Sequence, residues 1–298
     1  MTNLMTMDRQ QPPSVDVIIP VYCERSRSLA ATLSACLQQT YPISKIFVVD
    51  DGSPEPVSLP DWAQSQPNIS LLHLRQNQGI SAARNAAIAR SNARLLACVN
   101  TEVLPERGWL ATCAEYLHEH ANVGACFGRL VPEHPKRLLS RWRMRFQEPA
   151  KYGDTSGPAP FAPGHAVLFR REPIEQVGGY DVRYKSHYED SDLCERMRQA
   201  GWDVHYLAET YCVSVQEDTL VELSKKQLRN SDWRSADDYS LARLFLLQSR
   251  WLVVRLCRNL LKGRFLFIPI DFAIWGRSLQ IAVLSTLRIS QAEGSTSL

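Results

Sequence analysis

The stretch Val99 to Leu110, VNTEVLPERGWL, carries an amide and a carboxylate one residue apart, directly after the apolar run LLAC. The Asn100 side chain can both donate and accept hydrogen bonds. Glu102 offers hard oxygen atoms of the kind that bind Mg²⁺ or Mn²⁺. Two interpretations are open: an ordinary polar loop, or a carboxylate placed at the end of a strand to hold something charged.

Three further polar groups follow apolar runs in the same way. Tyr22 and Glu24 follow VDVIIPV, Asp50 and Asp51 close KIFVVDD, and residues 77–84 follow ISLLHLR. Open α/β sheets bind ligands at the edge where their parallel strands end. The four groups together therefore predict a ligand site at one sheet edge, although turns are polar in any protein.

The elements that must position these groups alternate along the first 130 residues. We expect strands at VDVIIPV, KIFVVDDGS, ISLLHLR and LLACVN, because these runs are apolar and rich in β-branched residues. Helical patterns lie between them: Leu29, Leu33 and Leu37 at a spacing of four, the Ala-rich GISAARNAAIARSNA, and a segment from about Pro105 to His120. This alternation predicts βαβ units and a mostly parallel sheet covered on both faces.

The pattern loosens after Leu130. Residues 132–160 are Pro-rich and basic, which predicts a long loop of the kind that often binds ligands. Then FAPGHAVLFRREPIEQVGGYD predicts a strand, a short helix and a Gly-Gly turn, and SHYEDSDLCERMRQAGWDVHYL a loop, a helix and a strand. The spacing of Asp192 and Glu195 is that of a capping box, so we expect this helix to begin at Asp192 and to leave Asp190 just before it.

Composition argues against several classes of protein. The net charge is only +3, and no Lys/Arg block is interleaved with aromatics in the main body, so we expect no nucleic-acid partner. The eight cysteines include no C-x-x-C pair, which argues against a zinc site or disulfide framework and favours a reducing cytosol. Residues 1–13 lack the pattern of a signal peptide and predict a disordered tail.

Six blocks stand in the order and spacing of a known family: VDVIIPVYCE, FVVDDGS, RQNQGISAARNAAI, LPERGWL, GGYD and YEDSDLCERMRQAGW. Over roughly Val15 to Leu207 the sequence resembles family 2 glycosyltransferases. The resemblance implies a GT-A fold, which is a Rossmann-like α/β sheet flanked by helices, and inverting transfer from a nucleotide-diphospho-sugar. We place the nucleotide-binding half at 14–130 and the acceptor and catalytic half at 131–225.

The resemblance also implies roles for individual residues. Tyr22 would pack on the nucleobase, and Asp50 would accept from its ring N–H, which fits a UDP- or dTDP-sugar. Asp190 would take the proton of the acceptor hydroxyl as general base, and Glu189 would contact the acceptor or brace its loop. The residues placed at the donor are Pro20, Tyr22, Glu24, Asp50, Asp51, Gly79, Arg84 and Asn100.

Structural roles stay open for several of these residues. Tyr22 could be a strand-end core aromatic, and the two aspartates could belong to an ordinary turn beside Gly52. Glu24 would touch the ribose or cap the next helix. Gly79 and Arg84 would form an anion site at a helix N-terminus or support the neighbouring loops.

Members of the family usually carry Asp-x-Asp where this chain has Asn100 and Glu102, and the later carboxylate ligates Mg²⁺ or Mn²⁺ at the donor diphosphate. Glu102 is therefore the candidate metal ligand. The family often supplies a later His ligand, where VSVQEDTL has Gln216. Three functions compete. The first is transfer to a hydroxyl of a glycan or glycolipid, as in cell-surface polysaccharide synthesis, and the second is a degenerate non-catalytic scaffold that binds nucleotide or glycan. The third, a nucleotidyltransferase of similar sheet architecture, would need a Gly-rich basic loop after the first strand, where PVYCERSRS has no glycine.

Residues 226–298 form the third predicted region, a helical extension that is strongly apolar but interrupted by charge. Its longest uncharged stretch is shorter than the roughly 18 residues of a spanning helix, so we expect no membrane crossing. At helical spacing Arg243, Arg250, Arg255, Arg258 and Lys262 fall on one side, and Phe245, Leu252, Val253, Leu256 and Leu260 on the other. This basic amphipathic pattern predicts peripheral contact with the cytoplasmic face of a membrane, or packing on the catalytic domain.

Overall fold

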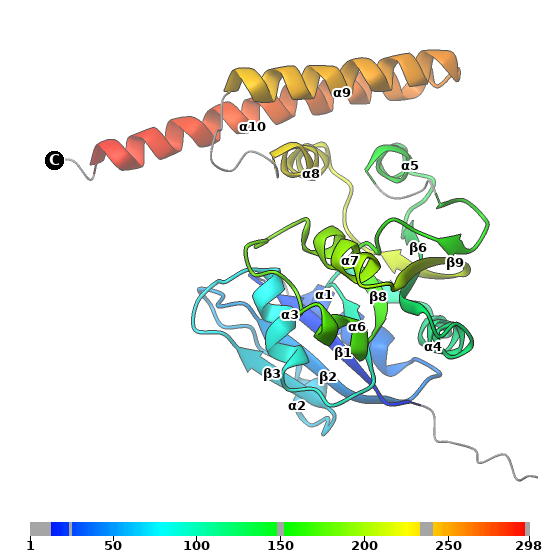
Figure 1. Cartoon of the computed structure of the whole chain (residues 1–298). Coiled ribbons are helices and arrows are strands. Elements are labelled where there is room, and N and C mark those ends of the chain that lie inside the picture. The colour runs from blue at the N-terminus through cyan, green and yellow to red at the C-terminus, as the bar shows by residue number, and fades with distance from the viewer. Residues whose placement is uncertain (1–12, 24–25, 148–151, 233–240, 296–298) are drawn as a thin grey trace, which may run out of the picture. The chain divides into compact units, whose positions relative to one another are not determined.

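The computed structural model describes residues 13–23, 26–147, 152–232 and 241–295, so the tail predicted at residues 1–13 lies almost wholly outside the described residues. The chain divides into two compact units (Figure 1). One comprises Met1–Gly128 and Thr155–Cys212, and the other comprises Arg129–Asp154 and Val213–Leu298. These units do not test the boundary predicted after residue 225, which stays a prediction.

The strands form one sheet in the order β3-β2-β1-β4-β8-β6-β9-β5, with β7 paired to β9. Strands β1 to β4 pair in parallel, and the order reverses between β1 and β4, which is the point where open α/β sheets bind ligands. The strands are β1 (Val15–Val21), β2 (Ile43–Asp50), β3 (Ile69–His73), β4 (Leu95–Val99), β5 (Val103–Pro105), β6 (Val123–Pro132), β7 (Gly157–Pro158), β8 (Ala166–Arg170) and β9 (Asp203–Ser214).

The second half of the sheet differs from the mostly parallel arrangement that the sequence predicts. Strand β8 pairs antiparallel with both β4 and β6, and β7 pairs antiparallel with β9. Because β8 is inserted between β4 and β6, its first residues lie beside the last residues of β4, and the Asn100 N–H donates to the His165 carbonyl. The reversal therefore brings a second loop to the edge where β1 and β4 end.

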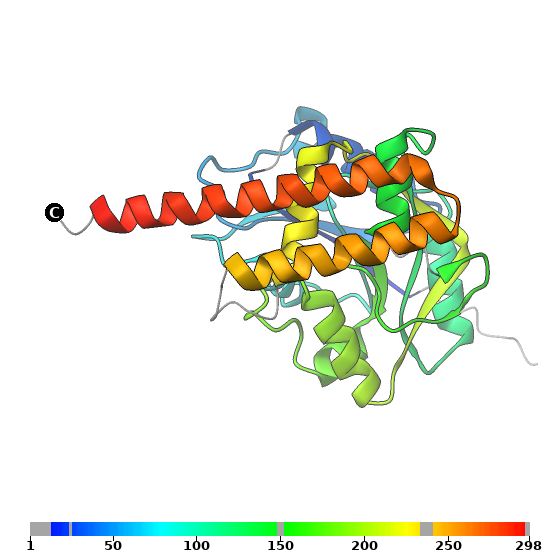
Figure 2. The ribbon, with the colours of Figure 1, turned by 90° about the horizontal axis from the view of Figure 1, so that it is seen from above.

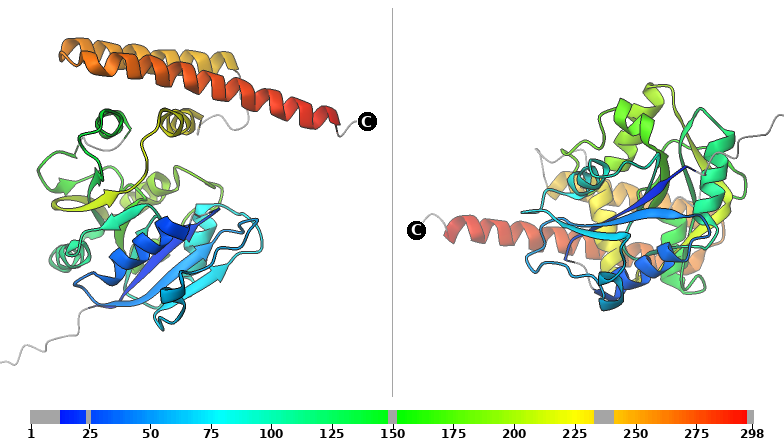
Figure 3. Two further views of the ribbon diagram at one scale, coloured as in Figure 1. Left: turned by 180° about the vertical axis from the view of Figure 1, so that it is seen from behind. Right: turned by 90° about the horizontal axis from the view of Figure 1, so that it is seen from below.

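Helices of the first unit cover the sheet on both sides. The front view shows α3 and the rear view shows α1, so these two helices lie on opposite faces of the parallel strands (Figures 1 and 3). Their apolar stripes explain this packing, since Leu29 and Leu33 of α1 and Ala83 and Ala87 of α3 are fully buried. The helices are α1 (Ser26–Leu37), α2 (Asp61–Gln64), α3 (Ile80–Ile88), α4 (Trp109–Glu119), α6 (Arg171–Gln176) and α7 (Glu189–Gln199).

The second unit is helical apart from the strand ends that enter it. Its elements are α5 (Leu138–Phe146), α8 (Leu220–Asp232), α9 (Leu241–Leu261), the 3₁₀ turn η2 (Phe265–Phe267) and α10 (Ile268–Ser295). Helices α9 and α10 run side by side in opposite directions as a hairpin (Figure 2). Helix α5 falls within the segment that we expected to be a long loop, and that expectation is wrong for residues 138–146.

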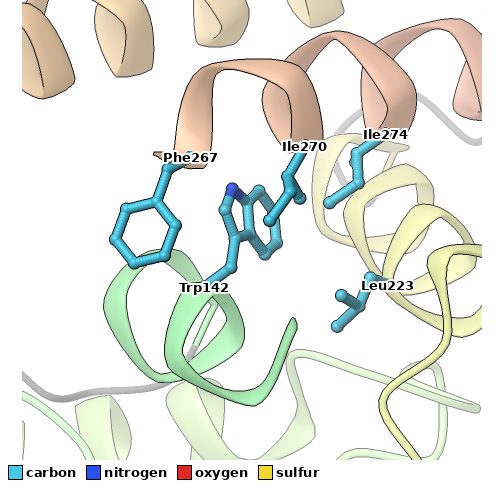
Figure 4. Packing of buried hydrophobic residues seen from close by; sticks show 5 residues of the cluster. All are labelled: Trp142, Leu223, Phe267, Ile270 and Ile274. Carbon is cyan, nitrogen blue, oxygen red and sulfur yellow. The ribbon is translucent and has the colours of Figure 1, made fainter. Parts of the chain in front are cut away.

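Trp142 explains why α5 forms. Its side chain is fully buried and packs with Leu223 of α8 and with Phe267, Ile270 and Ile274 of the hairpin (Figure 4). Its indole N–H donates to Asp271 over 2.9 Å. The segment 132–160 is rich in proline and arginine, and its helix is stabilised by distant partners rather than by an apolar pattern of its own.

The sides predicted for α9 are only partly correct. Arg255, expected on the solvent-facing basic side, is buried and pairs with Asp271 over 3.0 Å, while Val253 and Leu260, expected on the packed side, are exposed. Asn259 also donates to Asp271, over 2.7 Å. Spacing alone placed Arg255 with the other cations because its carboxylate partner lies 16 residues further along the chain.

A single helix of the described residues is long and apolar enough to cross a membrane by length and composition. It covers Phe265–Leu284, with a mean hydropathy of 1.3 over its most apolar window. Asp271 and Arg277 interrupt this helix, so its uncharged stretches are shorter than a spanning helix needs, and the expectation of no membrane crossing stays a prediction. Such a helix is weak support for a span, since core helices of soluble proteins pass the same test.

Candidate active site

The carboxyl ends of β1 and β2 bring two of the predicted donor residues to one edge. Pro20 lies within β1, opposite Val49 of β2, and Tyr22 follows and is 48% exposed. Tyr22 is thus no core aromatic, and its ring is open to a partner. Glu24 lies outside the described residues.

Asp50 and Asp51 are buried at the end of β2, and each carboxylate is bound by the chain itself. Asp50 accepts from the Ser53 N–H and hydroxyl and from the Val57 N–H, and its Oδ2 lies 2.9 Å from His73 Nδ1. Burial by itself raises the pKa of Asp50, but the bonds from Ser53 and His73 outweigh it, and the net pKa is lowered. Asp50 is therefore a turn-holding carboxylate in this structure.

Asp51 fixes the loop before α3. It accepts from the Gln78 N–H over 2.9 Å and from the Gly79 N–H over 2.8 Å. Gly79 has φ +94° and precedes α3, and a Cβ there would lie 2.4 Å from the Cα of Lys185. The Ile80 N–H donates to the carbonyl of Lys185, so the start of α3 is locked against the segment that leads into α7.

Arg84 joins three parts of the candidate site. Its guanidinium is fully buried and donates to Glu189 over 2.9 Å, to the Asn100 side-chain oxygen over 3.1 Å and to the Gly164 carbonyl over 2.8 Å. The ring of Tyr180 lies 5.1 Å from its central carbon. Arg84 thus supports the loops and is not free to bind an anion as its predicted alternative required.

The carboxylate predicted as general base lies next to this network. Asp190 accepts from the Gly164 N–H over 2.8 Å and from the Ser191 N–H over 2.7 Å. Burial and the neighbouring Glu189 carboxylate raise the pKa of Asp190, although the bond from Gly164 partly offsets them. Gly164 therefore bonds Arg84 through its carbonyl and Asp190 through its N–H, which fixes the two side chains relative to each other.

Helix α7 begins earlier than the sequence predicts. Its N-cap residue is Tyr188, in a left-handed conformation, so Glu189, Asp190 and Asp192 all lie in the first turn. Asp192 pairs with Arg196 one turn along over 2.7 Å and is no capping residue. The helix N-terminus favours the ionised carboxylates of all three residues, which explains why three acids are tolerated together.

Glu102 is exposed and sits in the turn after β4, with φ +66°. A non-glycine residue in this conformation costs about 1–3 kcal/mol, and such strain gathers at functional sites. No group of three His, Cys, Asp or Glu side chains suited to a metal was found in the described part of the chain. The donor set fits Mg²⁺ or Mn²⁺ only where a diphosphate supplies further oxygen ligands beside Glu102, as Mg²⁺ sites often do.

Asn100, which stands where the family usually has the first Asp of Asp-x-Asp, is hydrogen-bonded within the protein. Its side-chain oxygen accepts from Arg84, and its N–H donates to the His165 carbonyl. The side-chain amide belongs to the network beneath the site and links β4 to the base-bearing helix α7. Sequence reasoning also missed Gly164, Tyr180 and His73, of which only the GGYD block that contains Tyr180 gave a signal.

The sequence profile described as Glycosyl transferase family 2 matches residues 16–178, which is more than half of the chain and includes the ends of β1, β2 and β4. The chain belongs to this family. The resemblance read from the six blocks is therefore confirmed.

Curated relatives of this family 2 chain are named glycosyltransferases. The pre-mycofactocin glycosyltransferase of Mycobacterium tuberculosis is 29% identical over 219 residues, covering 67% of this chain and 44% of the relative. The N-acetylglucosaminyltransferase of Neorhizobium galegae is 29% identical over 234 residues, covering 73% and 54%. The chain spans about half the length of these curated relatives.

Solved structures show the fold. The mannosyltransferase PcManGT from Pyrobaculum calidifontis, in complex with GDP-Man and Mn²⁺, aligns with a TM-score of 0.61 at 18% identity over 91% of this chain and 87% of that chain. GalNAc-T7 with UDP, GalNAc and Mn²⁺ aligns with a TM-score of 0.54 at 11% identity, over 81% and 55%. The predicted GT-A fold of this family 2 chain is therefore confirmed.

Proposed function

We propose that the protein is an inverting glycosyltransferase that moves one sugar from a nucleotide-diphosphate donor to a hydroxyl of a glycan or glycolipid. The observation that carries this proposal is the network around Arg84 and Gly164. It holds Asp190 of α7 beside the end of β4, at the sheet edge where the strand order reverses between β1 and β4. A carboxylate fixed there can act on a substrate bound across the strand ends.

Asp190 would act as general base in a single displacement. The acceptor oxygen forms a bond to the anomeric carbon while the bond from that carbon to the diphosphate breaks, and the bonding pair leaves with the diphosphate. The acceptor proton passes to the Asp190 carboxylate. Its two backbone hydrogen bonds orient it, and its raised pKa makes it a stronger base than an ordinary aspartate.

At the donor we propose that Tyr22 stacks on the nucleobase and that Asp50 and Asp51 shape the loops around it. A UDP- or dTDP-sugar remains our proposal for the donor, and the two solved neighbours carry GDP-Man and UDP. Glu102 would hold a Mg²⁺ or Mn²⁺ ion together with phosphate oxygens. When bound, that ion would neutralise charge that grows on the departing diphosphate.

The proposal extends to the acceptor and to the location of the protein. Several relatives are named N-acetylglucosaminyltransferases, which supports a role in building a cell-surface glycan. We propose that the protein works on the cytoplasmic face of a membrane, on a lipid-linked acceptor. The exposed apolar residues of α9 and α10 support that location.

The general-base assignment is tested with Asp190→Asn. Removing the base should lower kcat for sugar transfer by about 10²- to 10⁴-fold, because the amide cannot take the acceptor proton. Binding of the nucleotide should be unchanged. Transfer from a panel of nucleotide sugars and nucleotide affinity by calorimetry measure the two quantities separately.

Asp192→Asn is the matched control, because Asp192 lies in the same helical turn but pairs with Arg196. We expect its kcat to stay within a fewfold of the wild type. Full activity of Asp190→Asn would contradict the base assignment. Nucleotide binding by the wild type without transfer from any donor to any acceptor would favour the non-catalytic scaffold, for which the altered Asn100 position is the supporting observation.

A further inference from the structure

The tip of the α9–α10 hairpin, residues 257–266, exposes large apolar side chains. Leu261, Phe265 and Leu266 are 87%, 63% and 70% exposed, and Leu260 is also exposed. Of the eighteen large apolar side chains exposed among the described residues, eleven lie between residues 245 and 284. Water-exposed patches of this kind mark interaction surfaces in soluble proteins.

The hairpin tip also carries the cations Arg258, Lys262 and Arg264. The end of α5, which bears Arg145, lies beside the hairpin, since the ring centroids of Phe146 and Phe267 are 6.0 Å apart. Burial together with the charges of Arg264 and Arg258 lowers the pKa of Arg145. Between residues 241 and 292 the sequence has eight Lys or Arg and a single acidic residue, Asp271. Asp271 is fully buried and already paired with Arg255. The cations of the hairpin tip therefore have no other acidic residue in this stretch of the sequence.

The exposed apolar side chains and the cations of the hairpin tip together indicate which kind of partner it binds. A second copy of this chain would bring like charges together at the tip, so self-association through it is disfavoured. A purely polar anion such as nucleic acid would leave the leucines and Phe265 in water. An anionic lipid surface accepts both groups at once, with the apolar side chains in the acyl boundary and the cations among the headgroups.

The same structure argues against a full crossing by α10. Asp271 lies near the start of the candidate span and accepts from Arg255, Asn259 and Trp142 of α5. A spanning α10 would have to leave these partners and carry a carboxylate into hydrocarbon. These contacts hold α5, α9 and α10 together as a folded unit.

We propose that the hairpin tip is an anionic-membrane docking site, in which Leu260, Leu261, Phe265 and Leu266 enter the interface and Arg145, Arg258, Lys262 and Arg264 bind acidic headgroups. This deepens the peripheral location proposed above and does not depend on catalysis. The tip would hold the enzyme at the surface where a lipid-linked acceptor is found.

The test is co-sedimentation of the full-length protein with vesicles of phosphatidylcholine alone, or with about 30% phosphatidylglycerol added. We expect binding to the acidic vesicles, little binding to the neutral ones, and release at about 0.5 M NaCl, because salt screens the headgroup charge. Glycerol phosphate at matched ionic strength should not compete, since an isolated headgroup offers no apolar interface. Competition would show a phosphate site and overturn membrane docking.

Two variants separate the contributions. Leu261→Ser/Phe265→Ser/Leu266→Ser should bind acidic vesicles at least about tenfold more weakly, because it removes apolar area from the interface. Arg145→Gln/Arg258→Gln/Arg264→Gln should lose about fivefold per charge and most of its salt dependence. The control Trp62→Ser/Val182→Ser removes exposed apolar residues of the first unit and should bind like the wild type.

The following results would overturn the membrane-docking proposal or identify another partner. Wild-type protein that stays with the supernatant, or tip and charge variants that bind like the wild type, would overturn the proposal. Concentration-dependent dimerisation that the tip variant abolishes, without vesicle binding, would show a second copy as the partner instead. Melting temperatures of all variants should match the wild type because the substituted side chains are exposed or only partly buried. Asp190→Asn should bind vesicles normally, so failure of docking and failure of the catalytic proposal remain distinguishable.

Discussion

The guanidinium of Arg84 donates to a carboxylate, an amide oxygen and a backbone carbonyl that come from three separate segments, although it is completely buried. A buried charge is tolerated only when paired and hydrogen-bonded. Its partners Glu189 and Asn100 lie beside the proposed base and at the end of β4. The residue that supports the site is therefore also the one that ties the two predicted halves of the enzyme domain together.

The pH dependence of transfer follows from the raised pKa of Asp190. A base acts only when ionised, so kcat/KM should fall as pH drops through the pKa of Asp190, which lies above the ordinary aspartate value of about 3.9. Glu189→Gln keeps an oxygen for Arg84 but removes a like charge beside Asp190, so it should move the acidic limb to lower pH. An unmoved limb in a variant that melts like the wild type would contradict this electrostatic coupling.

Glu102 gives a prediction with a built-in control. Asp and Asn are both tolerated at positive φ, so neither exchange should strain the turn at φ +66°. Glu102→Asp keeps a carboxylate and should retain much of the Mn²⁺ response of activity, whereas Glu102→Asn should need an Mn²⁺ concentration about tenfold or more higher for the same activity. Equal metal responses in the two variants would rule out Glu102 as the ligand.

Sequence patterns predicted which residues belong to the candidate site, but not which residues they contact. The family blocks placed Asp190, Glu189, Arg84 and Gly79 in segments that the structure brings together through Gly164 and Lys185. The blocks could not show that the Asn100 side-chain oxygen accepts a hydrogen bond from Arg84, since that bond joins residues 16 positions apart in the chain. Nor could they show the left-handed turn at Glu102, because a glutamate seldom adopts that conformation.

At the scale of elements, the start of α3 packs tightly against the segment around Lys185. Gly79→Ala should destabilise the protein by about 2–4 kcal/mol, because the new Cβ adds strain at φ +94° to a clash 2.4 Å from the Lys185 Cα. Chemical denaturation measures the loss. Transfer activity should fall as well, since the helix carries Arg84.

Gly201→Ala is the matched control for this packing. Gly201 has φ +92°, but a Cβ there would meet nothing within 4 Å. We expect a loss of only about 1–2 kcal/mol from backbone strain. Equal losses in the two variants would show that contact between α3 and the 185 segment contributes nothing.

Elements with their own apolar pattern were predictable, and those that depend on distant partners were not. The four parallel strands and α3 follow from local periodicity. Helix α5 was missed because its stabilising contacts come from Phe267, Ile270 and Ile274, more than 100 residues away. The first turn of α7 was misplaced because Tyr188, a poor capping residue by type, takes the left-handed cap position.

At the scale of the whole molecule, residues 129–154 belong with the C-terminal helices. A protein ending at Cys212 should aggregate or melt at clearly lower temperature, because Trp142 would lose the apolar cover of Leu223, Phe267, Ile270 and Ile274. Exposing a large buried side chain costs about 1.5–3 kcal/mol. Calorimetry and light scattering check this.

Adding back residues 213–298 as a separate polypeptide provides the control for truncation. If the second unit assembles from its pieces, co-expression should restore solubility and the melting transition. A truncated protein that is soluble and melts like the full chain would show that residues 129–154 need no partner. Trp142→Ala in the full chain should also destabilise the protein, by about 3–5 kcal/mol, because it leaves a cavity in the same core.

The discontinuous second unit also constrains how this protein can be altered by recombination. The chain passes from the first unit to the second within β6 and again within β9, so two stretches about 60 residues apart build one hydrophobic core. An exchange of the C-terminal region alone would bring in a hairpin that does not match Trp142. The tail and α5 must therefore be inherited, or engineered, as a pair.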